Sequence, residues 1–145
     1  MGNVKYGNSK TYPPNAISFY EEHSSEINWW LVSNNIISKT FASKFSDFLR
    51  WDEISCKKLG EDFIKSFPNK IKFEILFTRH KYEESFIVQF LEHINKDYLV
   101  DIILFQEFSK DCVDKIKELV QKTTNRYGPM YREKYSEFER KYLRN

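Results

Sequence analysis

The chain has 145 residues, enough for one ordinary domain that buries most of the surface its unfolded form would expose. Its 23 Lys and Arg against 21 Asp and Glu give a net charge of +2, a smaller basic excess than dedicated nucleic-acid binders carry. Aromatic residues make up 17% of the chain, whereas Gly and Pro number only 4 each. This composition is typical of closely packed helices and argues against a loop-rich β-sandwich.

Targeting signals and disulfide patterns are missing from the sequence. The polar N-terminus lacks the apolar core of a signal peptide, and the longest apolar run, residues 98–105, is too short to cross a bilayer. Cys56 and Cys112 make no zinc-binding spacing. We therefore expect a reduced, cytoplasmic setting and no contact with a membrane.

A repeat of about 22 residues runs through the chain. Trp29, Trp51 and Phe73 follow one another in steps of 22. Steps of 22 and 23 relate two further aromatic sets: Phe41, Phe63 and Phe86, and Phe45, Phe67 and Phe90. So many coincident positions predict a repeat architecture, whose end units are atypical because one side of each must face water.

The apolar spacing inside each unit is helical. Phe41, Phe45 and Leu49 lie at i, i+4 and i+8, the spacing of one helix face. Acceptable N-caps precede the longer helices: Asn15, Ser38, Gly60 and Ser109. Each longer helix follows a shorter segment, at residues 29–35, 52–58, 74–80 and 98–106. Each unit therefore reads as a short helix followed by a longer one.

Two features oppose this helical interpretation. Residues 73–77 and 98–105 contain enough branched and aromatic side chains to form strands. The matching segment 51–55 would make a poor strand, so we favour helix. Pro68 falls eight residues into its predicted helix and must kink or end it there.

The sequence thus predicts an all-α fold, a short solenoid of about 22-residue helix-turn-helix repeats with a C-terminal amphipathic helix. We expect a flexible N-terminal segment at 1–14, the repeat domain at 15–121, a linker at 122–128 and the amphipathic helix at 129–145.

The best-defined unit reads Trp51-x-x-Ile54-Ser55, then Leu59-Gly60-Glu61-Asp62-Phe63-Ile64-x-x-Phe67. It resembles a short repeat, W-x-x-I-S followed by L-S-E-x-F-I-x-x-F, of uncharacterised bacteriophage, giant-virus and bacterial proteins. The resemblance covers residues 28–95. Gly60 replaces the usual Ser, and Phe77 and Glu83 stand at the two Ser positions of the third unit. The resemblance implies helical repeats and a viral or mobile-element origin, but no activity and no site residues.

Catalytic and metal-binding patterns are missing too. His23 shares the spacing of core aromatics and is expected to face inward, whereas His80 and His93 are expected in solvent. Cys112 occupies a core position and reads as a small buried hydrophobe, and nothing near Cys56 supplies a base. The acidic residues gather in first turns of helices, where the helix dipole favours them. We expect no enzyme, no metal and no cofactor.

Basic side chains recur at the same turn of successive units and could form a ridge that contacts phosphates. The candidates are Arg50, Lys57, Lys58, Lys72, Arg79 and Lys81. Solvated turns balanced by the adjacent acidic first turns explain the pattern equally simply, and we favour that explanation.

Four aromatic residues lie on one face of the C-terminal helix at spacings of 4, 3 and 4: Tyr131, Tyr135, Phe138 and Tyr142. They must be buried somewhere. We favour a helix that covers the open end of the solenoid, and the alternative is a helix that binds a partner.

The sequence therefore favours a binding function over a catalytic one. The leading hypothesis is a non-enzymatic protein-binding module, a phage or viral inhibitor of a host defence component such as a CRISPR nuclease, acting in the host cytoplasm. The alternatives are a nucleic-acid-binding module that uses the basic ridge, and a structural or virion protein that forms homo-oligomers through open repeat ends.

Overall fold

The computed structural model describes residues 17–122 and 129–144. Every regular element in these residues is helical and none is a strand, which confirms the all-α prediction. The chain divides into two compact units, unit 1 at Met1–Ile71 and unit 2 at Lys72–Asn145. The predicted solenoid concerns the arrangement of both units and stays a prediction. The predicted N-terminal segment and most of the predicted linker lie outside the described residues.

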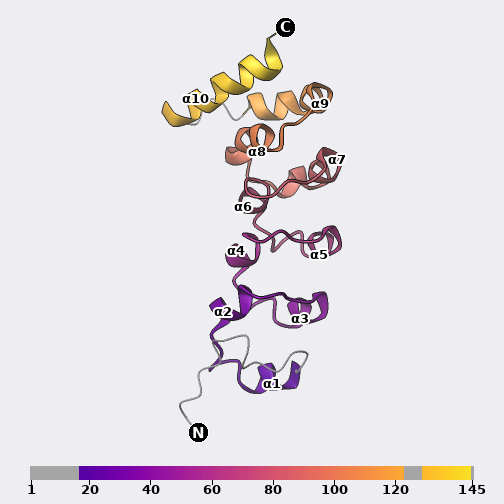
Figure 1. Ribbon diagram of the computed structural model, residues 1–145, viewed down its shortest axis with the longest axis vertical. Coiled ribbons are helices and arrows are strands. Elements are labelled where there is room, and N and C mark those ends of the chain that lie inside the picture. Colours follow the sequence, from indigo (N-terminus) through magenta and orange to yellow (C-terminus); the bar gives the residue numbers. More distant parts are fainter. Residues whose placement is uncertain (1–16, 123–128, 145) are drawn as a thin grey trace. The chain divides into compact units, whose positions relative to one another are not determined.

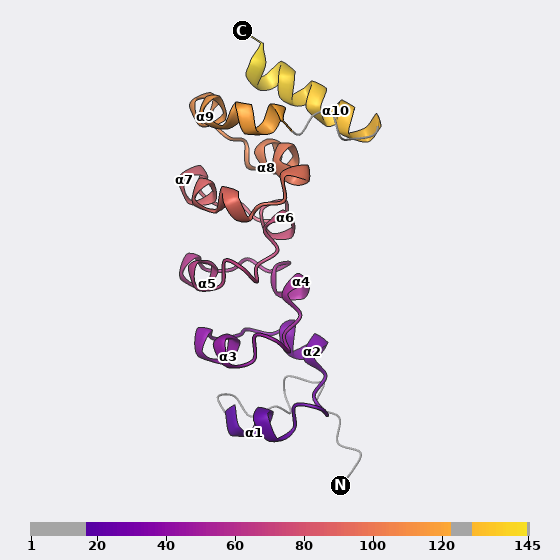
Figure 2. The same ribbon diagram turned by 180° about the vertical axis from the view of Figure 1, so that it is seen from behind.

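Unit 1 alternates short helices on its two sides. The described elements are α1 (Ile17–Glu22), α2 (Trp29–Ser33), α3 (Lys39–Lys44), α4 (Trp51–Ile54) and α5 (Glu61–Ser66). In Figures 1 and 2, α2 and α4 lie on one side of this unit, and α3 and α5 lie on the other. Each repeat of unit 1 is therefore a pair of short helices joined by a turn.

Unit 2 begins with the same arrangement and ends in longer helices. Its described elements are α6 (Phe73–Leu76), α7 (Glu84–Ile87), η2 (Val88–His93), η3 (Lys96–Tyr98), α8 (Leu99–Gln106), α9 (Lys110–Gln121), α10 (Pro129–Phe138) and η5 (Glu139–Leu143). The two segments that resembled strands form α6 and η3–α8, so the preference for helix was correct. In the described part of the chain, no helix combines the length and apolar character that crossing a bilayer requires.

Aromatic side chains at equal repeat positions make nearly equal contacts. In unit 1 the Trp29 ring lies 5.4 Å from Phe45, and Trp51 lies 5.2 Å from Phe67, between ring centroids. The Phe41–Phe45 and Phe63–Phe67 pairs follow at 4.7 and 5.0 Å. In unit 2 the matching rings of Phe73 and Phe90 are 5.0 Å apart. The 22-residue spacing thus reflects one small aromatic core built again in each repeat.

The longer helix of each repeat is shorter than its apolar pattern predicted. In the first two repeats it ends before the middle aromatic residue, where the backbone leaves the helical region at Phe45 (φ −114°, ψ 25°) and Phe67 (−132°, 50°). In the third repeat Phe90 (−111°, 15°) lies at a kink inside η2. Only Phe67 precedes a proline, so the break belongs to the repeat and not to Pro68. A further turn, closed by Leu49 N–H to Phe45 C=O at 3.1 Å, keeps Leu49 buried. The i, i+4, i+8 pattern therefore located the buried face correctly but wrongly predicted one continuous helix.

The Trp and Ser that recur in the first two repeats have structural roles. The indole N–H of Trp29 donates to Ser24 C=O at 3.0 Å, and that of Trp51 donates to Ser46 C=O at 2.8 Å. The buried hydroxyl of Ser55 donates to Trp51 C=O at 2.6 Å. These bonds fix the start of α2 and α4 against the preceding turn, because buried polar groups need partners.

Two of the predicted N-caps cap as expected. The Ser38 hydroxyl accepts from Phe41 N–H at 3.1 Å, and the Ser109 hydroxyl accepts from Cys112 N–H at 3.2 Å. Gly60 occupies the N-cap position of α5 without a side chain to bond. The fourth prediction, Asn15, lies outside the described residues.

Candidate functional site

The predicted phosphate contacts of unit 1 have different surroundings. The ammonium group of Lys57 is half-buried and donates to Asn35 C=O in the preceding repeat. Burial lowers the pKa of Lys57, and the nearby Glu53 carboxylate opposes that shift. Lys58 and Arg50 are exposed. Lys57 thus links two repeats, whereas Arg50 and Lys58 lie at exposed positions.

The predicted phosphate contacts of unit 2 differ in the same way. Lys81 donates to Phe105 C=O, and its ammonium lies 4.4 Å from the centroid of the Phe105 ring. The same ammonium is 3.9 Å from the Glu107 carboxylate. Lys72 and Arg79 are exposed. Because the six basic residues are divided between the two units, a continuous ridge stays a prediction.

The aromatic side chains of the C-terminal helix differ in burial within unit 2. Phe138 is fully buried and Tyr142 is 3% exposed. The Tyr142 hydroxyl donates to Phe108 C=O at 2.7 Å, and burial with the nearby Glu107 and Glu84 carboxylates raises its pKa to about 12. Tyr135 is partly exposed, and the side chain of Tyr131 lies outside the described residues. Phe138 and Tyr142 are therefore interior side chains of this unit.

The histidines and Cys112 do not form a reactive cluster. His23, expected to face inward, is partly exposed, with Nδ1 3.8 Å from a Glu26 carboxylate oxygen. His80 is partly exposed and His93 is exposed. Cys112 is only partly buried, like Phe63 at the same repeat position, whereas its neighbour Val113 is fully buried, so the expected burial of Cys112 was wrong. Within residues 17–122 and 129–144, no three His, Cys, Asp or Glu side chains are grouped as metal ligands.

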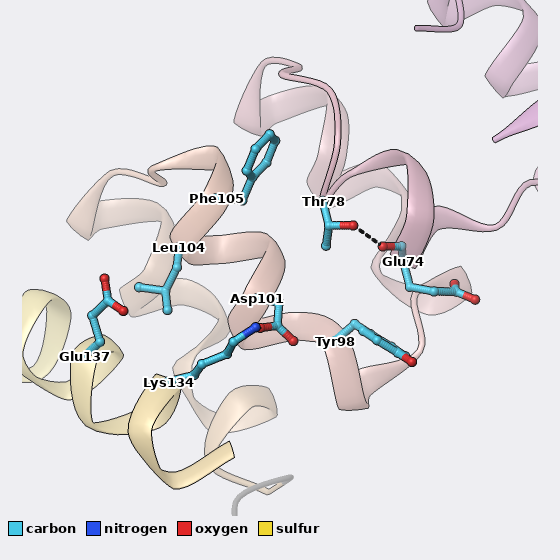
Figure 3. A pocket seen from close by; sticks show the side chains of 8 residues that line it. All are labelled: Glu74, Thr78, Tyr98, Asp101, Leu104, Phe105, Lys134 and Glu137. Carbon is cyan, nitrogen blue, oxygen red and sulfur yellow. Dashed lines mark hydrogen bonds and ion pairs between the residues drawn. The ribbon is translucent and has the colours of Figure 1, made fainter. Parts of the chain in front are cut away.

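Unit 2 contains a hollow of about 430 Å³. It is lined by Glu74, Thr78, Tyr98, Asp101, Leu104, Phe105, Lys134 and Glu137. Figure 3 shows Glu74 and Glu137 on opposite sides of it, and Asp101 directed at Lys134, with which it forms an ion pair. Acid/base catalysis needs groups that meet at one reacting atom, and these carboxylates do not converge.

Unit 1 contains a second hollow, of about 560 Å³. It is lined by Ile27, Asn28, Trp29, Trp30, Asp47, Phe48, Leu49 and Arg50. Trp30 is 48% exposed and Phe48 is 46% exposed, which is unusual for such large apolar side chains. We call Asn28, Trp30, Phe48 and Arg50 the Trp30 surface.

The sequence repeat does not predict the Trp30 surface, because its aromatic residues do not recur in the next repeats. Trp30 stands where the next two repeats have Asp52 and Glu74, and Phe48 stands where the next repeat has Lys70. The sequence feature that could have identified this surface is therefore an aromatic residue at a repeat position where the neighbouring repeats have a charged residue. Such a departure marks a place where one repeat differs from its neighbours on the solvent side.

The contacts around the Trp30 surface hold it in place. The Phe48 ring stacks on Trp29, with centroids 5.1 Å apart and planes inclined by 25°. The Asn28 side chain caps α2 by accepting from Leu31 N–H at 3.2 Å.

Comparison of the chain with family models, curated proteins and solved structures finds no match. The molecule's own surfaces are therefore the guide to its function.

Proposed function

We propose that the protein is a non-enzymatic repeat module that binds another protein through the Trp30 surface. The observation that carries the proposal is the pair of half-exposed aromatic side chains, Trp30 and Phe48, beside Arg50 around one hollow. Trp and Arg are enriched among the residues that contribute most binding energy in protein interfaces. Burying two such rings under a partner would supply several kcal/mol, at about 25 cal/mol per Å² of apolar area.

The rigidity of the surface also supports the proposal. Trp30 is on α2, whose last residue, Ser33, accepts from Arg50 N–H at 2.8 Å. That bond fixes the backbone of Arg50 relative to the helix that carries Trp30. A surface already held in its binding arrangement loses little conformational entropy when a partner docks.

A displayed random-peptide selection tests the proposal and does not require the partner to be identified first. The wild-type protein is immobilised, bound peptides are enriched, and each enriched peptide is measured against Trp30→Ala and Phe48→Ala. We expect both variants to lose at least about tenfold in affinity, since truncating a central interface aromatic typically costs about 2 kcal/mol or more. The matched control is Tyr98→Ala, which removes a 44% exposed aromatic ring from unit 2 and should leave binding unchanged. No enrichment, or enriched peptides that bind all variants equally, would contradict the proposal.

The resemblance to phage and giant-virus repeats supports a more specific proposal. The partner is then a host defence component, such as a CRISPR nuclease, and the protein acts as its inhibitor in the host cytoplasm. Plasmid interference in cells that carry a CRISPR system tests this: the wild-type protein should protect the target plasmid and Trp30→Ala should not. Unchanged interference in the presence of the protein would count against that system as the target.

The nucleic-acid alternative has less support. Of the six basic residues that could contact phosphates, Lys57 and Lys81 already donate to backbone carbonyls. A backbone-tracking site needs several available cations in a row, because each neutralised phosphate contributes to affinity. Binding to DNA or RNA that falls steeply with salt would restore this alternative.

A further inference from the structure

We infer that the Trp30 surface recognises a protein segment in which an acidic side chain lies next to an apolar one. The inference rests on the proposed protein-binding function and adds the chemistry of the partner. It follows from two residues with hydrogen-bond donors, Trp30 and Arg50, that line the same hollow as the exposed rings.

Trp30 differs from the other two tryptophans in its indole N–H. Trp29 and Trp51 each donate to a backbone carbonyl, at 3.0 and 2.8 Å. For Trp30, no acceptor for Nε1 is found among the described residues, although the ring is about half-buried. The indole N–H is a donor only, so its complement on a partner is an acceptor.

Arg50 supplies a positive charge on the same hollow. Its backbone N–H is used by Ser33, but no acceptor for its guanidinium is found in the described part of the chain. Asp47, the acidic residue that lines the same hollow, lies 3.3 Å from the Lys70 ammonium and is thus already paired. The guanidinium geometry matches a carboxylate, which can accept two parallel N–H bonds.

The rings of Trp30 and Phe48 define the second half of the recognised segment. An apolar side chain that covers their exposed faces contributes a favourable free energy of burial. The carboxylate of the same segment accepts hydrogen bonds from the donors of Trp30 and Arg50. An acidic residue followed or preceded by an aliphatic or aromatic one satisfies both requirements. Nucleic acid fits less well, because its backbone carries a charge on every phosphate and Arg50 is the one basic residue among those that line the hollow.

The three indole N–H groups allow a direct test by two-dimensional ¹H–¹⁵N NMR. The probes are blocked pentapeptides of sequence Gly-Leu-Asp-Phe-Gly and its matched forms with Asn or Lys in place of Asp. We expect the Asp peptide to shift the Trp30 indole resonance, with the Asn peptide at least about tenfold weaker, because hydrogen bonds to charged groups are the stronger ones. The Trp51 resonance, from a ring outside the hollow, should stay in place and report that each variant is folded.

Variants identify the donors. Arg50→Gln should weaken the Asp peptide at least about tenfold and reduce its preference over the Asn peptide, whereas Lys58→Gln, which removes an exposed charge outside the hollow, should have no effect. Trp30→Phe keeps a ring but removes the N–H, and it should weaken the Asp peptide more than the Asn peptide. Equal binding of the Asp and Asn peptides, or of wild type and Arg50→Gln, overturns the inference.

Two further outcomes separate this inference from the proposed function. If the displayed-peptide selection enriches Trp30-dependent peptides without acidic residues, the acidic partner is wrong and protein binding stands. If a single-stranded dT12 oligonucleotide shifts the Trp30 resonance at lower concentration than the Asp peptide does, the surface binds nucleic acid and both proposals fail.

Discussion

The backbone N–H of Arg50 donates to the buried hydroxyl of Ser33 at 2.8 Å, across 17 residues of sequence. The same hydroxyl donates to Trp29 C=O at 2.7 Å. One side chain therefore uses its donor and an acceptor to join the end of one short helix to the residue that precedes the next.

Removing that hydroxyl should destabilise unit 1. Ser33→Ala leaves Arg50 N–H and Trp29 C=O without this partner, and we expect a loss of about 1–3 kcal/mol in the free energy of unfolding. Ser43→Ala, at an exposed position of α3, should stay within about 0.5 kcal/mol of wild type. Denaturant titrations of both variants check this, and equal midpoints would refute the bridging role of Ser33.

The aromatic core predicts unequal costs for similar truncations within unit 1. Phe45 is 2% exposed, so Phe45→Ala should cost about 3–5 kcal/mol. Phe63 is partly exposed, and Phe63→Ala should cost less because part of its surface already faces solvent. Denaturant titration followed by tryptophan fluorescence measures both, and the reverse order would contradict this difference in burial.

Tyr142 predicts a specific pH dependence. Its pKa is raised to about 12 in the folded protein, above the ordinary value of 10.0, so the folded state favours the neutral phenol. The stabilisation is fully present below pH 10 and is lost as the pH rises toward 12. Tyr142→Phe has no phenol to ionise, so its stability should fall less steeply over this range. Parallel unfolding titrations at about pH 8 and about pH 11 compare the two proteins, and identical decreases would show that Tyr142 does not contribute.

The C-terminal helix should be needed for the stability of unit 2. A chain that ends at residue 128 loses Phe138 and Tyr142, both buried, and leaves Phe108 C=O without the Tyr142 hydroxyl. We expect a lower melting temperature or aggregation, measured by calorimetry and gel filtration. Unchanged melting would mean that α10 contributes little to folding and would favour a partner-binding role for this segment.

The repeat could be predicted from the sequence, because the spacing of apolar side chains indicates which residues share a core. Trp29, Trp51 and Phe73 start successive short helices, as their 22-residue steps predicted. The breaks at Phe45, Phe67 and Phe90 could not be predicted from the sequence. An i, i+4, i+8 series of apolar residues continues through a tight turn when that turn still buries the last apolar residue of the series. Spacing identifies buried faces, whereas helix ends depend on backbone geometry that side-chain type fixes only weakly.

The Trp30 surface, which we propose as the binding site, was harder to predict for the opposite reason. Self-similarity emphasises what recurs, and Trp30 and Phe48 are departures from the pattern. Equal repeat positions likewise offered six basic residues as candidate phosphate contacts, although solvated turns were favoured, and in the fold Lys57 and Lys81 donate to the carbonyls of Asn35 and Phe105. Only the folded arrangement shows which lysines donate to backbone carbonyls.

Trp29, Trp30 and Trp51 all belong to unit 1, so the molecule carries an intrinsic optical label on one half of its chain. Tryptophan emission will follow the melting of unit 1, whereas far-ultraviolet circular dichroism averages over the helices of both units. Superimposable melting curves from the two signals would mean that the halves unfold as one cooperative system. Separated curves would instead assign a distinct melting step to each half without any engineered probe.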